Sequence, residues 1–312
     1  MSIRVLVTGG AGYLGSILCE HLLAAGHQVT VLDRLLYRQH SLFHLCANPR
    51  FDFVTGDARD ESKLAPLVRK ADVLIPLAAV VGAPACDADP WLATSTNLDA
   101  VLLLNDIRSK DQLVVYPNTN SGYGTKSGEI YCTEDTPLEP ITLYGQDKVR
   151  AEQELLASPN TIALRLATVF GASPRMRLDL LVNHFVYAAV TDGYVVIFEE
   201  HFKRNYIHIR DVAGALLHAI QNRSKMIGRA YNAGLDDANL SKEELAMKIK
   251  QHVPRFHVVF SELGSDPDKR NYIVSNQRLR DAGFEAKRSL DEGIVELLKV
   301  YRLMGRGEFK NI

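Results

Sequence analysis

Short apolar runs alternate with longer segments of helical periodicity through the first half of the chain. The first run, 3–7, is rich in β-branched residues and predicts a buried strand, and apolar positions in 13–25 recur at the spacing of an amphipathic helix. The alternation continues with expected strands at 28–32, 51–55, 72–76, 112–116 and 161–166 and expected helices at 60–70, 90–108 and 144–157. Strands that alternate with helices in this way favour an α/β fold with a doubly wound parallel sheet.

After residue 166 the alternation becomes irregular. We expect strands at 194–198 and near Val258, a helix from near Arg210, and helices at 241–253, 276–282 and 290–304. Residues 1–170 are therefore expected to form one regular domain. Residues 171–312 are expected to form mainly a smaller lobe, with some segments returning to the first domain.

Composition removes several classes of function. The chain has 312 residues, 46% of them hydrophobic, and a net charge of −1, which gives no bulk electrostatic case for nucleic acid or an acidic membrane. The longest apolar stretch, 73–85, contains two prolines and is too short to span a bilayer. The first residues already predict a core strand, so we expect no signal peptide. The four cysteines are scattered, which argues against zinc and disulfides. We expect a cytoplasmic protein without a metal, nucleic-acid or membrane partner.

Three glycines join the first strand to the first helix. The strand ends just before Gly9, and Gly12 and Gly15 follow at three-residue spacing. Such glycines permit a tight turn, close approach of backbone to a pyrophosphate, and close packing of helix on strand. The helix N-terminus, with Tyr13 and Leu14, would then present free N–H groups and a positive dipole end to phosphate oxygens. The alternative is a glycine-rich turn that binds nothing.

Acidic residues follow the next two strands. Asp33 ends the second strand, where a carboxylate accepts from both ribose hydroxyls of NAD and repels the 2′-phosphate of NADP. Arg34 would soften that preference, and Asp33 could instead be a helix cap or loop acid. Asp57, with Ala58 after it, follows the third strand and is expected to accept from the adenine amino group. Its alternative role is to cap the helix at 60–70.

The fourth and fifth strands end in further candidates. Leu77, Ala78 and Ala79 follow the fourth strand, where backbone would pass beside the cofactor, and Asn97 lies on the following helix. Thr119 comes shortly after the fifth strand. Because ligands of doubly wound sheets lie beyond the strand carboxyl ends, all of these residues are expected at one edge.

The helix that begins near residue 144 carries a second spacing with chemical meaning. Tyr144 and Lys148 are four residues apart and share one helix face. A tyrosine hydroxyl near pKa 10 is a poor base, but a neighbouring ammonium lowers that pKa. The tuned phenol can then take a proton from a sugar hydroxyl, with Thr119 bonding the same oxygen. Taken alone, the pair could also be an ordinary helix start.

Together these motifs resemble a family. The motifs are T-G-G-A-G-Y-L-G at 8–15, Asp33, Gly56-Asp57, Thr119 before Tyr123-Gly124, Tyr144 to Lys148, Arg165 to Gly171, and R-N-Y-I-H-I-R-D-V at 204–212. Over nearly its whole length the chain resembles the extended short-chain dehydrogenase/reductases, specifically the nucleotide-sugar epimerases and dehydratases. The resemblance implies a Rossmann domain at 1–170 with NAD as cofactor, a substrate lobe at 171–312, and a nucleotide-diphosphate sugar as substrate. It also implies a homodimer built by the helices from Pro90 and Tyr144.

Departures from the family pattern narrow the expected reaction. Sugar 4,6-dehydratases carry an Asp-Glu pair directly after the catalytic threonine, and here those positions hold Asn120 and Ser121. An amide and a hydroxyl are poor substitutes for acid-base groups, so elimination of water is not expected. The family usually carries a histidine directly before Leu77, and this chain has Pro76 at that position. What remains is oxidation at C4 of the sugar, kept as the net reaction or reversed as epimerisation.

Longer shared stretches point to a subgroup. Residues 76–79, 116–124, 173–183 and 266–270 resemble enzymes of capsule-sugar synthesis, among them the bacterial enzyme that oxidises C4 of GDP-manno-heptose. That resemblance implies a 4-keto product and a tightly held NAD.

The second half supplies the expected substrate contacts. By the resemblance, Arg204 and Arg270 bind the diphosphate, which suits a planar guanidinium. Arg175, Asn183 and His201, together with Asn120 and Ser121, complete the predicted substrate-binding set. The alternatives are ordinary salt bridges for the arginines, including Arg175 or Arg177 with Asp179, and a structural histidine. His208 and Asp211 are expected to pack and to cap the helix near Arg210.

Two rival functions stay open. A 4-epimerase would use the same residues. It would differ in leaving the 4-keto intermediate room to rotate in the pocket and in returning the hydride from the cofactor. A non-catalytic NAD-binding regulator on the same fold would not need Tyr144 and Lys148. The sequence leaves the nucleotide, GDP or UDP, open.

Overall fold

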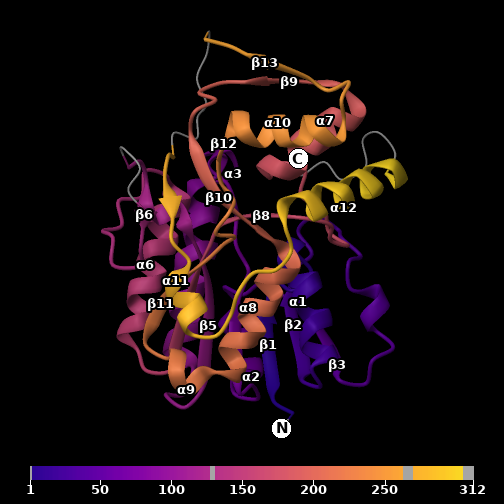
Figure 1. Cartoon of the computed structure of the whole chain (residues 1–312). Helices are drawn as coiled ribbons and strands as arrows, with labels where there is room; N and C mark the ends of the chain where they lie inside the picture. The colour runs from indigo at the N-terminus through magenta and orange to yellow at the C-terminus, as the bar shows by residue number, and fades with distance from the viewer. Residues whose placement is uncertain (1, 127–130, 263–269, 305–312) are drawn as a thin grey trace.

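A seven-stranded parallel sheet forms the centre of the molecule, with strand order β11-β7-β5-β4-β1-β2-β3 (Figure 1). The computed structural model describes residues 2–126, 131–262 and 270–304. The strands are β1 Arg4–Thr8, β2 Gln28–Asp33, β3 Phe51–Thr55, β4 Val73–Pro76, β5 Leu113–Thr119, β7 Thr161–Leu166 and β11 Arg229–Ala233. The expected doubly wound parallel sheet is confirmed. The strand order reverses between β1 and β4, the point at which such sheets bind ligands.

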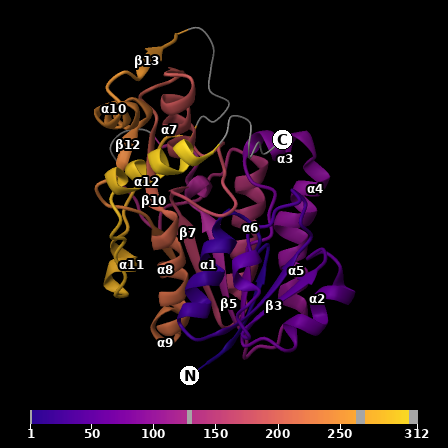
Figure 2. The same ribbon diagram turned by 90° about the vertical axis from the view of Figure 1, so that its right-hand side faces the viewer.

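Alternating side chains of the strands build a core on each face of the sheet. Val5 and Val7 of β1 point into one core and Leu6 into the other. The first core lies under α1 (Tyr13–Ala24) and α8 (Ile209–Gln221), and the second under α2 (Glu61–Val68), α5 (Ala100–Ile107) and α6 (Leu143–Ala157). Figure 2 shows α8 and α5 on opposite sides of the sheet.

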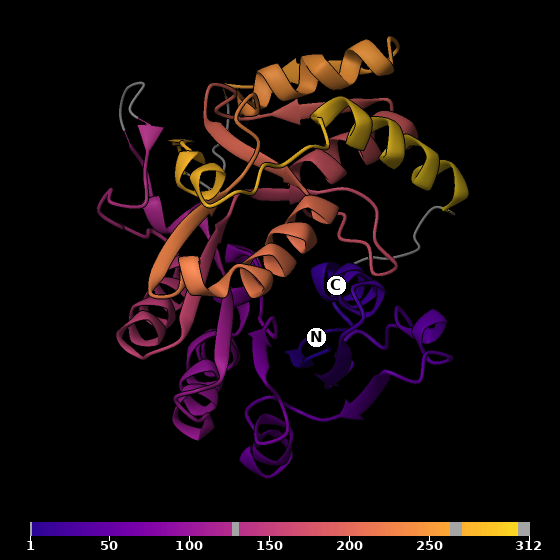
Figure 3. The same ribbon diagram turned by 60° about the horizontal axis from the view of Figure 1, so that its bottom comes forward.

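The rest of the second half lies beyond the carboxyl ends of the strands. It contains a three-stranded sheet, β12-β10-β8, and a parallel pair, β9 with β13. Its elements are β8 Thr168–Phe170, α7 Leu181–Thr191, β9 Tyr194–Ile197, β10 Lys203–His208, β12 Asn239–Ser241, α10 Lys242–His252, β13 His257–Phe260 and α12 Leu290–Leu303. Figures 1 and 3 show α10 and α12 at this end of the molecule. This region therefore stands over the edge of the sheet at which doubly wound sheets bind their ligands.

Smaller elements complete the chain. They are η1 Phe43–Leu45, α3 Ala83–Ala88, α4 Pro90–Thr94, η2 Ser95–Asp99, η3 Asn120–Tyr123, β6 Tyr131–Cys132, α9 Arg223–Met226, β14 Ile273–Val274 and α11 Gln277–Asp281. Strand β6 pairs with β14. Of the stretch 266–270 that supported the subgroup resemblance, 266–269 lies outside the described residues.

The expected helix at 90–108 is present, but it is not a regular α-helix throughout. It is α4, then a π-helical turn, η2, then α5. The wide turn carries Asn97, whose Oδ1 accepts from the Val80 N–H at 2.8 Å and whose Nδ2 donates to the Val80 carbonyl at 2.9 Å. We attribute the break in the regular helix to these two hydrogen bonds, which tie the helix to the loop after β4.

Candidate active site

The glycine turn has the geometry that its spacing predicts. Gly9 has a φ of +73°, and a Cβ there would lie 2.5 Å from the backbone nitrogen of Ala78. A Cβ at Gly15 would lie 2.6 Å from the Cα of Gly10. Gly9 therefore lets the loop after β4 pass against the turn, and Gly15 lets α1 pack on it.

The start of α1 fits a dinucleotide pyrophosphate. Gly12 is the N-cap, no side chain among the described residues caps this end, and the first turn carries no acid. A Cβ at Gly12 would have only the Gly9 carbonyl oxygen nearby, at 3.1 Å, so the outer side of the turn is open. Uncapped N–H groups and the helix dipole favour a negatively charged ligand there.

Tyr13 points back into the protein rather than toward a cofactor. Its buried hydroxyl donates to the Gly171 carbonyl at 2.7 Å and accepts from Asn183 Nδ2 at 3.2 Å. Burial raises the pKa of this hydroxyl well above its ordinary value. Leu14 packs against the core. Both residues can reach a cofactor at the turn through their backbone N–H groups, while the Tyr13 side chain links the turn to the loop after β8.

Asp33 holds the turn at the end of β2. Its Oδ2 accepts from the Ala11 N–H at 3.0 Å and its Oδ1 from the Leu35 N–H at 2.8 Å. Burial raises the pKa of this carboxyl, and the two backbone bonds oppose that rise. Each oxygen keeps lone-pair capacity, so the loop-acid role and the predicted ribose contact are compatible.

Asp57 sits among cations at the end of β3. Arg59 donates to both of its carboxylate oxygens, at 3.0 and 2.7 Å, and Arg34 donates to Oδ2 at 3.1 Å. Arg59 is the main cause that lowers the pKa of Asp57 to about 2. The alternative role as a helix cap is wrong, because Asp60 caps α2 by accepting from Ser62. Ala58 follows in the same turn.

The loop after β4 runs beside the glycine turn. The N–H of Leu77 bonds the Thr8 carbonyl at 3.0 Å, and that of Ala78 bonds Thr8 Oγ1 at 3.4 Å. Ala79 follows, and Asn97 fixes the next residue, Val80, as described above. Asn97 is itself buried, so it shapes the predicted cofactor edge through this loop.

Helix α6 delivers the tyrosine and the lysine to the same edge. Thr142 caps the helix by accepting from the Gly145 N–H at 3.2 Å. Lys148 Nζ donates to the Pro117 carbonyl at 2.7 Å and lies 3.9 Å from the centre of the Tyr116 ring. Burial lowers the pKa of Lys148 to about 7. The lysine is therefore anchored to β5 just before Thr119.

The electrostatics of Tyr144 differ from the sequence expectation. Burial raises the pKa of its hydroxyl to about 12, and the charges of Arg177 and then Arg270 act in the opposite direction. We expected Lys148 to be the tuning cation, and the strongest one is Arg177. The salt bridge with Asp179, which the sequence left open as an alternative, is present for Arg177, and no spacing in the sequence indicates that Arg177 also acts on Tyr144.

Ser121 joins Thr119 to Arg270. Thr119 Oγ1 accepts from the Ser121 N–H at 3.1 Å and shares a hydrogen bond of 2.8 Å with Ser121 Oγ, which accepts from Arg270 Nη1. Asn120 is wholly buried, and within the described ranges its side-chain amide has no hydrogen-bond partner. A polar ligand at this edge would supply one.

The remaining predicted substrate residues differ in how far they are buried. Arg204 is buried, with Nη1 on the Lys203 carbonyl at 2.9 Å, and Arg175 lies 4.8 Å from the Tyr37 ring. His201 is exposed and contacts the Phe202 ring.

Asn183 is held from three sides. Its Oδ1 accepts from the Gly171 N–H at 3.1 Å, and its Nδ2 donates to Tyr13 Oη and, at 2.9 Å, to the Arg177 carbonyl. We expected this amide to contact the sugar or diphosphate, and its donors are instead engaged in tying the Arg177 loop to the glycine turn.

Two expectations for the start of α8 have different outcomes. His208 caps the helix, since its Nδ1 accepts from the Arg210 N–H at 3.2 Å. Asp211 does not cap α8, because its carboxylate accepts from the N–H groups of Lys287 and Arg288 before α12.

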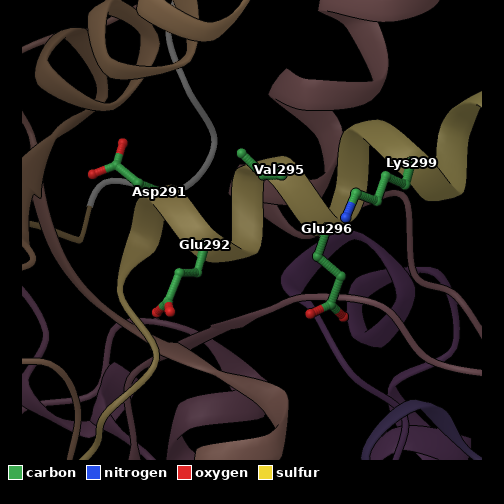
Figure 4. Close-up of a pocket in the computed structure, with 5 residues that line it drawn as sticks. All are labelled: Asp291, Glu292, Val295, Glu296 and Lys299. Atoms are coloured by element: carbon green, nitrogen blue, oxygen red, sulfur yellow. The ribbon is translucent and has the colours of Figure 1, made fainter.

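A hollow along α12 is separate from these residues. Figure 4 shows its lining side chains, which are Asp291, Glu292, Val295, Glu296 and Lys299. None of the predicted site residues is among them. Glu296 instead supports the loop after β8, where it accepts from the Ala172 N–H at 2.9 Å.

No helix within the described residues has the length and apolar character needed to cross a membrane.

Comparison with known proteins finds relatives that match this chain over nearly its whole length. A low-salt glycan biosynthesis protein of Haloferax volcanii is 29% identical, over 95% of this chain and 98% of its own. UDP-glucose 4-epimerase of Mycolicibacterium smegmatis is 29% identical, over 96% and 99%. UDP-glucuronic acid 4-epimerase from Bacillus cereus, solved with UDP-glucuronic acid and NAD, shares the fold with a TM-score of 0.84 at 23% identity, over 96% of this chain and 99% of its own.

A family model covers the part of the chain that contains the seven-stranded sheet. It matches residues 5–234, from β1 through β11, and its description names NAD as the cofactor. The match agrees with the uncapped α1 and with Asp33 at the end of β2, and it confirms both NAD and the expected enzyme class. This chain belongs to the NAD dependent epimerase/dehydratase family.

Proposed function

We propose that this enzyme oxidises C4 of a nucleotide-diphosphate sugar to a 4-keto sugar for capsule or surface polysaccharide biosynthesis, with GDP-D-glycero-manno-heptose as the substrate. The observation that carries the proposal is the pair of residues after Thr119. Asn120 and Ser121 are an amide and a hydroxyl, and Ser121 bonds Thr119 directly. Elimination of water needs an acid and a base beside the sugar, whereas oxidation needs only one proton acceptor.

Tyr144 is the proposed proton acceptor. Its phenolate would take the proton from the C4 hydroxyl, while Thr119 donates to or accepts from the same oxygen. Arg177 and Arg270 stabilise the phenolate against the effect of burial. Lys148, which donates to the Pro117 carbonyl, would hydrogen-bond the nicotinamide ribose and add positive charge. When bound, NAD supplies the acceptor for the hydrogen and electron pair that leave C4.

The two regions would divide the substrates between them. We propose that residues 1–170 hold NAD and residues 171–312 mainly hold the sugar nucleotide, with α8 and β11 contributing to the layers of the first region. Arg204 and Arg270 are the proposed diphosphate ligands. A cytoplasmic homodimer formed through the helices that start at Pro90 and Leu143 completes the proposal.

A second candidate function is 4-epimerisation. It is favoured by the UDP-glucose 4-epimerases among the relatives, at 28–29% identity. The same Tyr144, Lys148 and Thr119 would act in both directions, and the 4-keto sugar would turn in the pocket between them. A non-catalytic regulator is disfavoured, because relatives over most of this chain are named as epimerases and decarboxylases.

The experiment is a substrate panel with the purified enzyme. GDP- and UDP-sugars, including GDP-D-glycero-manno-heptose, are incubated with NAD, and reduced nicotinamide is followed by absorbance while NMR reports the stereochemistry of the sugar. A 4-keto product with stoichiometric reduced nicotinamide supports oxidation. A sugar inverted at C4 without net reduction shows the epimerase instead.

A further inference from the structure

One face of α6 carries three ionisable side chains in successive turns. They are Tyr144, Lys148 and Glu152, spaced four residues apart. Lys148 is only 5% exposed and Glu152 only 1% exposed. A buried carboxylate is costly unless it is paired and hydrogen-bonded, so the partners of Glu152 indicate what it holds in place.

Glu152 and Lys148 together anchor the end of β5. Lys148 Nζ donates to the Pro117 carbonyl at 2.7 Å, and Asn118 Nδ2 donates to Glu152 Oε2 at 2.5 Å. The next residue is Thr119. Two consecutive turns of α6 therefore fix the two residues that precede the catalytic threonine.

The other partner of Glu152 comes from the neighbouring strand. Arg165 of β7 donates to Glu152 Oε1 at 2.7 Å from Nη2 and at 3.1 Å from Nε. Arg165 is also the register partner of Asn118 across β5 and β7. One carboxylate thus bridges adjacent residues of two strands and joins both to the helix.

The same arginine also reaches the segment that follows Thr119. Arg165 Nη1 donates to Tyr123 Oη at 3.1 Å, and Tyr123 Oη donates to Asn232 Oδ1 of β11 at 2.7 Å. Thr119 is consequently fixed from both sides, by Asn118 before it and by Tyr123 after it.

Glu152 also sets the charge environment of the lysine. Lys148 has Tyr144 and Glu152 one turn away on α6 and the Tyr116 ring of β5 beside it, with Arg165 of β7 on the far side of Glu152. Burial lowers the pKa of Lys148, and Glu152 is the charged group that opposes this effect. Without the carboxylate, Lys148 would lose its proton at a lower pH.

We propose that Glu152 is a positioning residue for the catalytic edge, which holds Thr119 in place through Asn118 and Arg165 and sets a carboxylate one helical turn from Lys148. This role rests on the proposed use of Thr119 and Lys148 in catalysis. Glu152 is itself 1% exposed, and its carboxylate accepts from Asn118 and Arg165.

The test replaces the charge and keeps the shape. Glu152→Gln retains a carbonyl that can accept from Asn118, and Glu154→Gln removes an exposed carboxylate from the same helix as the matched control. Lysine ¹³Cε NMR, with the Lys148 signal identified by its loss in Lys148→Met, gives the titration midpoint. We expect Glu152→Gln to lower this midpoint by about one pH unit or more and to leave it unchanged in the control.

Activity provides the second readout. In Glu152→Gln we expect kcat at pH 8 to fall roughly 10-fold or more, with KM for the sugar nucleotide within about twofold, because the lost ammonium acts in the reaction. The alkaline limb of the kcat profile should move to lower pH together with the NMR midpoint. A lowered melting temperature with an unmoved NMR midpoint would show a merely structural residue and overturn the proposal.

A second variant covers failure to fold. Glu152→Gln leaves the buried Arg165 without its carboxylate partner, so Glu152→Gln/Arg165→Met removes both charges. The Lys148 midpoint should again fall, and an unchanged midpoint in the folded double variant contradicts the proposal. If Lys148 shifts but no sugar nucleotide is turned over even by the natural protein, the proposed function fails while the charge effect of Glu152 stands.

Discussion

The proposed cofactor edge and the proposed catalytic edge of the sheet differ in the groups that form them. The first, at residues 9–15 and Asp33, consists of close-packed backbone, uncapped N–H groups and one carboxylate. The second, at the ends of β5 and β7 and on α6, consists of buried side chains whose charges act on one another. The difference teaches that the cofactor edge should be sensitive to added volume, and the catalytic edge to charge and pH.

The largest effect is expected at the catalytic edge. Tyr144→Phe removes the proposed proton acceptor while keeping the ring, so kcat should fall roughly 10²–10⁴-fold. The Kd for NAD, measured by calorimetry, should stay within about twofold of the natural value, since the cofactor edge is untouched. A variant that keeps more than a tenth of the activity would remove Tyr144 from the reaction.

The steric character of the cofactor edge is tested by a matched pair of glycines. Gly9 and Gly193 have nearly equal φ angles, +73° and +77°, but a Cβ at Gly193 would meet no atom of the described residues within 4 Å. Each alanine variant should lose about 1–2 kcal/mol of unfolding free energy through its backbone conformation. Gly9→Ala should lose about 1–3 kcal/mol more through its contact with Ala78, and NAD binding with it.

Urea unfolding and NAD titration of both variants measure this contrast. Equal losses in the two proteins, with NAD binding retained in Gly9→Ala, would show that the close approach of the loop at Ala78 has no consequence.

Arg177 gives a smaller, pH-dependent effect. Its charge lowers the pKa of Tyr144, so Arg177→Met should raise that pKa and move the acidic limb of kcat/KM to higher pH, by up to about one unit. Arg150→Met, an exposed change on α6, is the control. Identical profiles for the two variants would remove Arg177 from the electrostatics of the site.

The smallest effect is expected at Asp57. Its pKa is lowered to about 2, mainly by Arg59, so its ion pairs stabilise the fold above pH 4 and are lost as the pH falls from about 4 to 2. Because the carboxylate is partly exposed, Asp57→Asn should cost on the order of 1 kcal/mol at pH 6. Thermal unfolding should show this difference shrinking toward pH 2, and a difference that grows there would reverse the sign of the argument.

The cofactor edge could be predicted from the sequence because its chemistry is local. Gly9, Gly12 and Gly15 lie close together in the sequence, where β1 leads into α1, and Asp33 ends the next strand. Spacing alone therefore places them. Tyr144 and Lys148 were predictable for the same reason, since helical periodicity puts them on one face.

The contacts that complete the catalytic edge are long-range. Arg177 acts on Tyr144 from a loop beyond β8, and Glu152 meets Arg165 from a different strand, which no short spacing shows. The four-residue step from Lys148 to Glu152 was the available signal. The edge strand β11 has the sequence R-A-Y-N-A, without a β-branched run, and its pairing with β7 was therefore hidden.

Oxidation at C4 is the central claim, and a substrate deuterated at C4 tests it most directly. A single turnover with the deuterated sugar nucleotide and NAD is analysed by mass spectrometry of the separated cofactor and sugar. The account predicts deuterium in the cofactor and an unlabelled 4-keto sugar, with both lost in Tyr144→Phe. Deuterium recovered at C4 of an inverted sugar would contradict net oxidation and establish the epimerase.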